Sequence, residues 1–159
     1  MRPLTNEQRE VIADWLIVAG AALLFVSLFL SWSHQFSPAF LAVWGTSDAL
    51  RGVPLSPNAW QVYSSADVLL ALLAVALVAV AVLGSRPARF GVLAAALIAL
   101  AFTLHALAVP PTNGATIFNP ALNVPNYFPS SATSGPGETL ALIALGVGIA
   151  GLGLSFTAD

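Results

Sequence analysis

Four ionisable side chains are the residues of this sequence best suited to chemistry. They are His34, Asp67, His105 and Glu138, and each lies close to one end of a long apolar run. Two imidazoles and two carboxylates suit a divalent metal, a polar head group or a proton relay. We therefore treat them as a candidate ligand-binding cluster, and we expect His105 to contact Asp67 or Glu138.

Each of these residues also has a simpler structural explanation. Asp67 follows Ser64 and Ser65 where a helix begins, so it fits a helix cap. Glu138 falls in the first turn of another helix, where the helix dipole favours an acid. His34 fits an ordinary loop position, and a hydrogen bond to a neighbouring helix would explain His105. The sequence leaves open whether the cluster is a site or a set of caps, and it names no metal or cofactor.

Long apolar segments must position these side chains. Hydrophobic residues make up 58% of the 159-residue chain and charged residues 8%, against roughly a quarter charged in soluble domains. Four runs are long enough to cross a hydrocarbon core of about 30 Å. We predict an all-α, four-transmembrane-helix bundle that forms a single domain over 1–159. Its helices are expected at about 6–32, 67–84, 88–109 and 137–157.

The arginines indicate how the bundle is oriented in its membrane. Arg2 and Arg9 precede the first run, Arg86 and Arg89 lie between the second and the third, and Arg51 lies on the opposite side. Basic residues are enriched on the cytoplasmic side of membrane proteins. We therefore expect a multi-pass protein of the plasma membrane with both termini in the cytoplasm.

The two outer loops, at about 33–66 and 110–136, differ in kind from the short inner loop. They contain nine of the eleven prolines and several aromatic residues, whereas disordered linkers are poor in aromatics. We expect the two loops to form an ordered cap over the outer end of the bundle. Trp44 and Trp60 in the first loop are further candidates for contact with a ligand or a partner.

Small residues recur along one face of each run at steps of three and four. Helices in lipid pack closely through such residues. The positions assigned to helix packing are Gly20, Ser27, Ala74, Ala81, Gly148 and Gly151. On the third run the same spacing selects Gly91, Ala94, Ile98, Ala101 and His105 as the face toward the bundle.

Two short stretches resemble a known group of proteins. Val26–Trp32 (VSLFLSW) and Ala59–Leu73 (AWQVYSSADVLLALL) resemble uncharacterised four-helix integral membrane proteins of high-GC Gram-positive bacteria. In those proteins the first helix often ends in a Leu-Phe-Leu-Pro-Trp-like run, in which Ser31 here replaces the proline. The resemblance implies a fold and no activity. The layout is also similar to claudin-like tetraspans, but the cysteine pair of their loop is missing, because this chain has no cysteine.

The sequence gives little support to catalysis. It contains no P-loop, no HExxH and no GxSxG motif, and the net charge of -2 does not suggest a nucleic-acid partner. We predict a non-enzymatic integral membrane protein that acts by association, as an accessory subunit of a membrane complex or as a homo-oligomer. Its expected partners are membrane lipids and another protein or itself. One alternative is a binder or conduit for a lipid, quinone or other small amphipathic molecule at the outer leaflet. The other is a membrane metalloprotein or enzyme.

Overall fold

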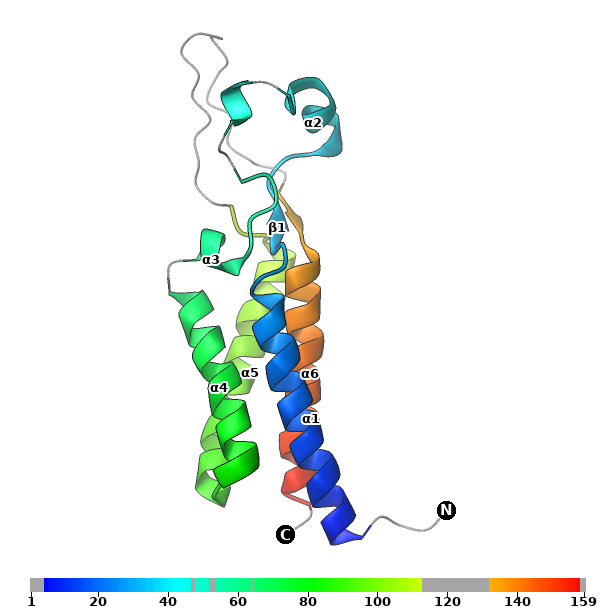
Figure 1. The fold of residues 1–159 in the computed structure, drawn as a ribbon, viewed down its shortest axis with the longest axis vertical. Helices are drawn as coiled ribbons and strands as arrows, with labels where there is room; N and C mark the ends of the chain where they lie inside the picture. Colours follow the sequence, from blue (N-terminus) through cyan, green and yellow to red (C-terminus); the bar gives the residue numbers. More distant parts are fainter. Residues whose placement is uncertain (1–4, 47, 52–53, 64, 113–131, 158–159) are drawn as a thin grey trace.

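The fold is built on four long helices that run side by side (Figure 1). The computed structural model describes residues 5–46, 48–51, 54–63, 65–112 and 132–157. The long helices are α1 (Asn6–Ser27), α4 (Ala66–Leu83), α5 (Arg86–Ala108) and α6 (Pro136–Ser155). All four are long and apolar enough to span a membrane, which agrees with the predicted four spans of a multi-pass membrane protein.

Shorter elements lie in the first outer loop, where the sequence predicts no helices. They are β1 (Ser33–His34), α2 (Pro38–Trp44), the 3-10 helix η1 (Asp48–Leu50) and α3 (Ala59–Val62). The short strand β2 (Thr133–Ser134) precedes α6 and pairs antiparallel with β1, with Ser33 opposite Ser134 and His34 opposite Thr133. We call the end of the bundle with β1 and α3 the loop end. The end with both termini and the α4–α5 turn is the terminal end (Figure 1).

The first helix is shorter than the sequence predicts. It ends at Ser27 rather than near residue 32. The Trp32 indole N–H donates to the Ser27 carbonyl at 2.8 Å, and the Trp32 backbone N–H donates to the Pro57 carbonyl at 2.9 Å. The last residues of the apolar run, up to Trp32, are therefore not helical and bond to the first outer loop instead. Hydropathy alone does not distinguish these residues from the helix that precedes them.

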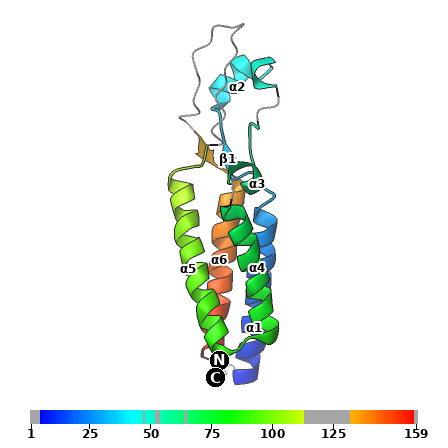
Figure 2. The same ribbon diagram turned by 90° about the vertical axis from the view of Figure 1, so that its left-hand side faces the viewer.

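The closest helix pair in the bundle is α1 with α6, and α6 also contacts α5 (Figure 2). Glycines permit this approach, because a Cβ added to Gly20 would lie 2.7 Å from the Gly148 backbone nitrogen. A Cβ on Gly151 would lie 2.8 Å from the Ala13 carbonyl oxygen. Of the predicted packing positions, Ala81 is half-buried and the others are buried, namely Gly20, Ser27, Ala74, Gly148 and Gly151.

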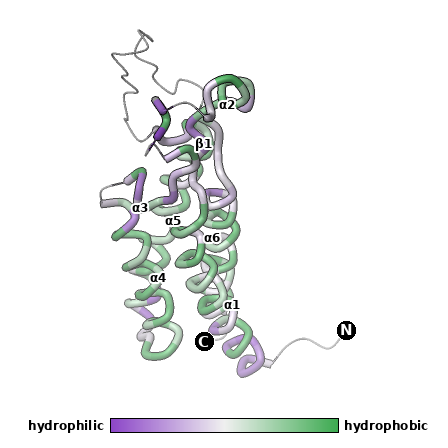
Figure 3. Tube along the Cα trace, turned by 45° about the horizontal axis from the view of Figure 1, so that its top comes forward, coloured by the Kyte–Doolittle hydropathy of each residue, from purple (hydrophilic) through white to green (hydrophobic). Residues whose placement is uncertain are grey.

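The face of α5 that the sequence assigns to the bundle is turned outward instead. Gly91, Ala94, Ile98, Ala101 and His105 are all exposed, and Ile98 is 72% exposed. The inward residues are Ala96, Ala99, Thr103 and Ala106. The prediction was wrong because α5 carries small residues on both faces. The long helices are apolar along most of their length (Figure 3) and also expose large apolar side chains such as Leu69 and Leu97, so periodicity does not select one face.

The predicted cap of two ordered loops is not confirmed. Residues 113–131 of the second outer loop lie outside the described residues, so an ordered cap of two loops stays a prediction. The described flanks of this loop do contact the first loop, through the β1–β2 pair and through Gln35, whose Nε2 donates to the Pro111 carbonyl at 3.0 Å.

Candidate functional site

The candidate site lies at the loop end, where α6 begins beside the end of α1. The first residues of α6 are held against α1 by close contacts, since a Cβ on Gly137 would lie 2.6 Å from the Trp32 ring and 2.9 Å from the Ser27 carbonyl oxygen. The Gly137 N–H donates to the Ser31 carbonyl at 2.8 Å. This clamp turns the next residue, Glu138, into the interior of the bundle.

Glu138 is the most unusual side chain of the site. It is 0% exposed, and neither carboxylate oxygen accepts a hydrogen bond from any residue that the structure describes. A glutamate in the first turn commonly accepts the N–H of the N-cap residue. Here the N-cap N–H, that of Gly135, donates to the Trp32 carbonyl at 2.8 Å. A buried and unpaired carboxylate is costly, so Glu138 is suited to holding a proton or a cationic group.

A chain of aromatic rings packs at the same end of the bundle. Trp32 and Tyr63 meet edge to face with centroids 5.6 Å apart, and Tyr63 meets Phe102 of α5 at 5.3 Å. Burial, and secondarily the negative charge of Glu138, raises the pKa of Tyr63 to about 12. The Tyr63 phenol is therefore neutral at physiological pH and lies within the electrostatic reach of Glu138.

Asp67 is not the cap of its helix, because Ser65 is the N-cap of α4, and Asp67 is instead an acid of the first turn. It is 4% exposed. Its Oδ1 accepts the N–H of Val68 at 2.8 Å, so this carboxylate already satisfies a backbone donor. Unlike Glu138, Asp67 has a structural role in its own helix.

The two histidines do not join the carboxylates. His34 lies in β1, and its Nδ1 shares a hydrogen bond of 2.8 Å with the Ser56 hydroxyl. His105 is exposed on the outward face of α5. Over the described residues no hydrogen bond or ion pair links His105 to Asp67 or Glu138. The rotation of α5 that turns Thr103 and Ala106 inward explains the exposure of His105.

These placements determine what chemistry the site supports. Within the described part of the chain, no three His, Cys, Asp or Glu side chains come close enough to ligate one metal ion. The cluster predicted from His34, Asp67, His105 and Glu138 is therefore not assembled as a metal site by these residues. The distinctive feature of the site is the buried Glu138 carboxylate, which has no hydrogen-bond partner among the described residues.

The two loop tryptophans lie in different short helices of the first outer loop. Trp44 closes α2 and is 38% exposed. Trp60 lies in α3, is also 38% exposed, and packs on Phe29 with centroids 6.0 Å apart. Trp60 therefore holds α3 against the end of α1, while Trp44 presents its ring to the surroundings.

Sequence reasoning missed a charged pair at the terminal end. Arg89 in the first turn of α5 is 9% exposed, and its Nη2 lies 3.7 Å from Oδ1 of Asp14 in α1. From the sequence, Arg89 was used only as an indicator of membrane orientation. The available signal was that Asp14 and Arg89 both lie toward the terminal end of two helices, α1 and α5, that run in the same direction.

The chain matches no protein-family model, no curated protein and no solved structure. The resemblance based on Val26–Trp32 and Ala59–Leu73 therefore stays an expectation.

Proposed function

We propose that this protein is a non-enzymatic membrane protein that acts by association, packing against a transmembrane helix of a second copy or of a partner subunit. The observation that carries the proposal is a second glycine face on α6. The residues of this outward face are Thr139, Ile143, Gly146, Ala150 and Gly153, all of them exposed. They follow the same steps of four and three as the face that packs on α1.

The glycines on the two faces of α6 differ in what surrounds them. A Cβ at Gly151 would press on α1, whereas a Cβ at Gly146 or Gly153 would meet nothing within 4 Å. Glycine inside a helix costs about 1 kcal/mol relative to alanine. The fold of one copy explains that cost at Gly151 but not at Gly146 or Gly153. Close approach of another helix explains it, because small residues let helix backbones meet in lipid.

An outward polar residue on α5 supports the same proposal independently. His105 is exposed in the last turn of this membrane-spanning helix, and no residue of the described chain bonds to its ring. Polar side chains within membrane helices commonly face protein and form hydrogen bonds across helices. A second chain beside α5 would give His105 such a partner.

The orientation in the membrane is part of this proposal. Arg9, Arg86 and Arg89 lie at the terminal end, and Arg51 lies in the first outer loop. The excess of arginine supports a cytoplasmic location of the terminal end. The loop end, with Glu138 and the first outer loop, would then face outward.

The test is the mass of the purified protein in a mild detergent. We expect a dimer or larger homo-oligomer, or a stable complex with one co-purifying membrane protein, and these two outcomes identify which partner is used. A double variant, Gly146→Leu with Gly153→Leu, should yield the monomer, whereas Ala19→Leu at an exposed position on α1 should not. A wild-type protein that is monomeric, with no stoichiometric partner, would refute the proposal.

A second candidate function, binding of a small amphipathic molecule at the loop end, has one specific observation in its favour. Glu138 is buried without a hydrogen-bond partner among the described residues, within electrostatic reach of the Tyr63 phenol. Such a carboxylate suits a cationic or hydroxyl-bearing head group. Native mass spectrometry of protein from its own membrane tests this, since a bound mass present in the wild type and absent in Glu138→Gln would support it.

A further inference from the structure

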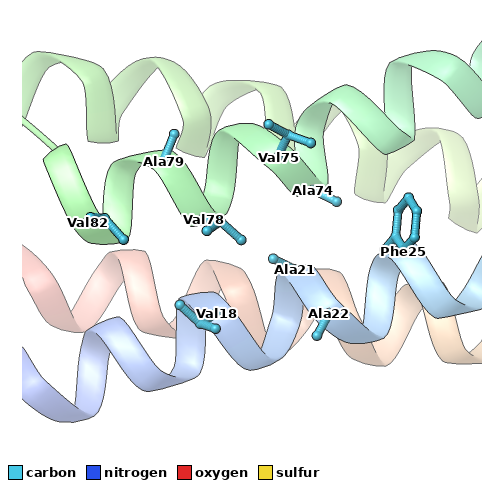
Figure 4. Close-up of a pocket in the computed structure, with 9 residues that line it drawn as sticks. All are labelled: Val18, Ala21, Ala22, Phe25, Ala74, Val75, Val78, Ala79 and Val82. Carbon is cyan, nitrogen blue, oxygen red and sulfur yellow. The ribbon is translucent and has the colours of Figure 1, made fainter.

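An open apolar groove runs between the second half of α1 and the second half of α4 (Figure 4). It has a volume of about 540 Å³. Its floor and walls include Ala21, Ala74, Val75, Val78, Val82 and Phe25. The floor alanines are buried, while the valine and phenylalanine walls are exposed. The groove is therefore a surface feature that opens toward the membrane.

The groove continues toward the terminal end into a polar mouth. A second hollow of about 360 Å³ shares Val18 and Val82 with it and is lined by Asp14 and Trp15. A third hollow adjoins the second at Val11 and is lined by Glu7. A single track thus leads along α1 from an acidic end to an apolar end.

The length of the apolar track limits what can occupy it. From Asp14 to Phe25 the helix rises roughly 16 Å at 1.5 Å per residue. This is close to half of a hydrocarbon core of about 30 Å, which is the depth of one leaflet. Beyond Phe25 the aromatic contacts Phe25–Phe29, at 5.4 Å, and Phe29–Trp60, at 6.0 Å, occupy the surface. A helix of a partner protein would need a seat across the full core, whereas an acyl chain of one leaflet needs this length.

The charges at the mouth indicate the head group. Glu7 and Asp14 line the hollows, and the residues that line them include no lysine or arginine in the described part of the chain. The Asp14 side chain is 34% exposed, and Arg89 approaches its Oδ1 at 3.7 Å. Trp15 is 71% exposed at the depth where tryptophan commonly meets lipid head groups. Two carboxylates and an indole face complement an ammonium group.

We propose that this groove binds one phospholipid of the leaflet at the terminal end, with an acyl chain between α1 and α4 and an ammonium-bearing head group at Asp14 and Glu7. Phosphatidylethanolamine has this chemistry, whereas phosphatidylglycerol has the same chains without the ammonium. The site is distinct from the outward face of α6, so it does not depend on the proposed association.

The experiment is native mass spectrometry of the full-length protein released from bilayers of equal parts phosphatidylethanolamine and phosphatidylglycerol. We expect retained phosphatidylethanolamine in excess over phosphatidylglycerol. Ala22→Phe or Ala79→Phe, which place a ring in the groove at exposed positions, should reduce retention about tenfold. Asp14→Asn should remove the preference for the ammonium head group while leaving the acyl chain bound.

The matched control is Ala19→Phe, which adds the same ring at an exposed position of α1 that does not line the groove. Its lipid retention should equal that of the wild type, and a circular dichroism melt of each variant checks that the bundle is folded. Three results would overturn the proposal. They are no retained lipid in the wild type, equal loss in Ala19→Phe and Ala22→Phe, or equal retention of the two lipids.

Discussion

Gly20 of α1 and Gly148 of α6 meet backbone to backbone, so closely that a Cβ on Gly20 would lie 2.7 Å from the Gly148 nitrogen and 2.8 Å from the Ala144 carbonyl oxygen. We therefore predict that Gly20→Ala destabilises the bundle by about 1–3 kcal/mol, since over-packing of a tight interface costs this much. Thermal or denaturant unfolding in a fixed detergent measures it.

The matched control for this substitution lies on another helix. Gly91→Ala on α5 adds a methyl group where nothing lies within 4 Å, so it should leave stability unchanged or raise it by up to about 1 kcal/mol through helix propensity. Equal losses in the two variants would contradict the close contact between α1 and α6.

The Asp14–Arg89 pair at the terminal end should contribute more to stability than the Asp48–Arg51 pair, although its two charged atoms lie further apart. Arg51 and Asp48 are 2.8 Å apart but more than four-fifths exposed, whereas Arg89 and Asp14 are 3.7 Å apart with side chains 11% and 34% exposed. Arg89→Met should cost about 1–3 kcal/mol, because it leaves a partly buried carboxylate unpaired. Arg51→Met should change stability by less than about 0.5 kcal/mol. Unfolding measurements that give the opposite order would show that the Asp14–Arg89 contact is not formed.

The Tyr63 phenol predicts a titration at alkaline pH. Its pKa is raised from 10.0 to about 12, first by burial and then by Glu138. A folded pKa above the unfolded value means that stability is retained below pH 10.0 and falls as the pH rises toward 12. Tyrosinate absorbance in a Tyr127→Phe background follows Tyr63 alone, because the sequence has two tyrosines. Glu138→Gln should lower the pKa while leaving it above 10.0. An unchanged Tyr63 pKa in that variant would show that the charge of Glu138 does not act on the phenol.

The proposed orientation predicts one-sided labelling. The chain has no cysteine, so single cysteines report their own location. Thr46→Cys follows α2 at the loop end, and Ser85→Cys lies in the turn between α4 and α5 at the terminal end. A membrane-impermeant maleimide applied to intact cells should label the first and spare the second until the cells are opened. The reverse pattern would invert the orientation.

Hydropathy was sufficient to predict the four spans. Long runs with almost no acidic or basic residues cannot form the surface helices of a soluble domain, so a membrane-spanning helix is the main remaining structure. Glycine was sufficient to predict the α6 face toward α1, since Gly148 and Gly151 have a helix-propensity cost that packing must offset. Alanine was not sufficient on α5, where Ala94 and Ala101 face outward and Ala96 and Ala99 face inward.

The candidate site was harder to predict for a different physical reason. Glu138 and Asp67 look alike in the sequence, as acids in the first turn of a membrane helix. Asp67 accepts a backbone N–H of its own helix, whereas the donor expected for Glu138 is bonded to Trp32. That difference arises from the clamp between α6 and the end of α1, which is a tertiary contact and leaves no local pattern.

The central claim is that the outward face of α6 packs on another membrane helix, and native mass spectrometry of the protein from its own membrane tests it most directly. A single spectrum reports the number of copies, any partner subunit and any bound lipid. We predict an oligomer or a stoichiometric complex for the wild type and a folded monomer for the Gly146→Leu, Gly153→Leu variant. A monomeric wild type without a protein partner, or a variant with the same stoichiometry as the wild type, would contradict the claim.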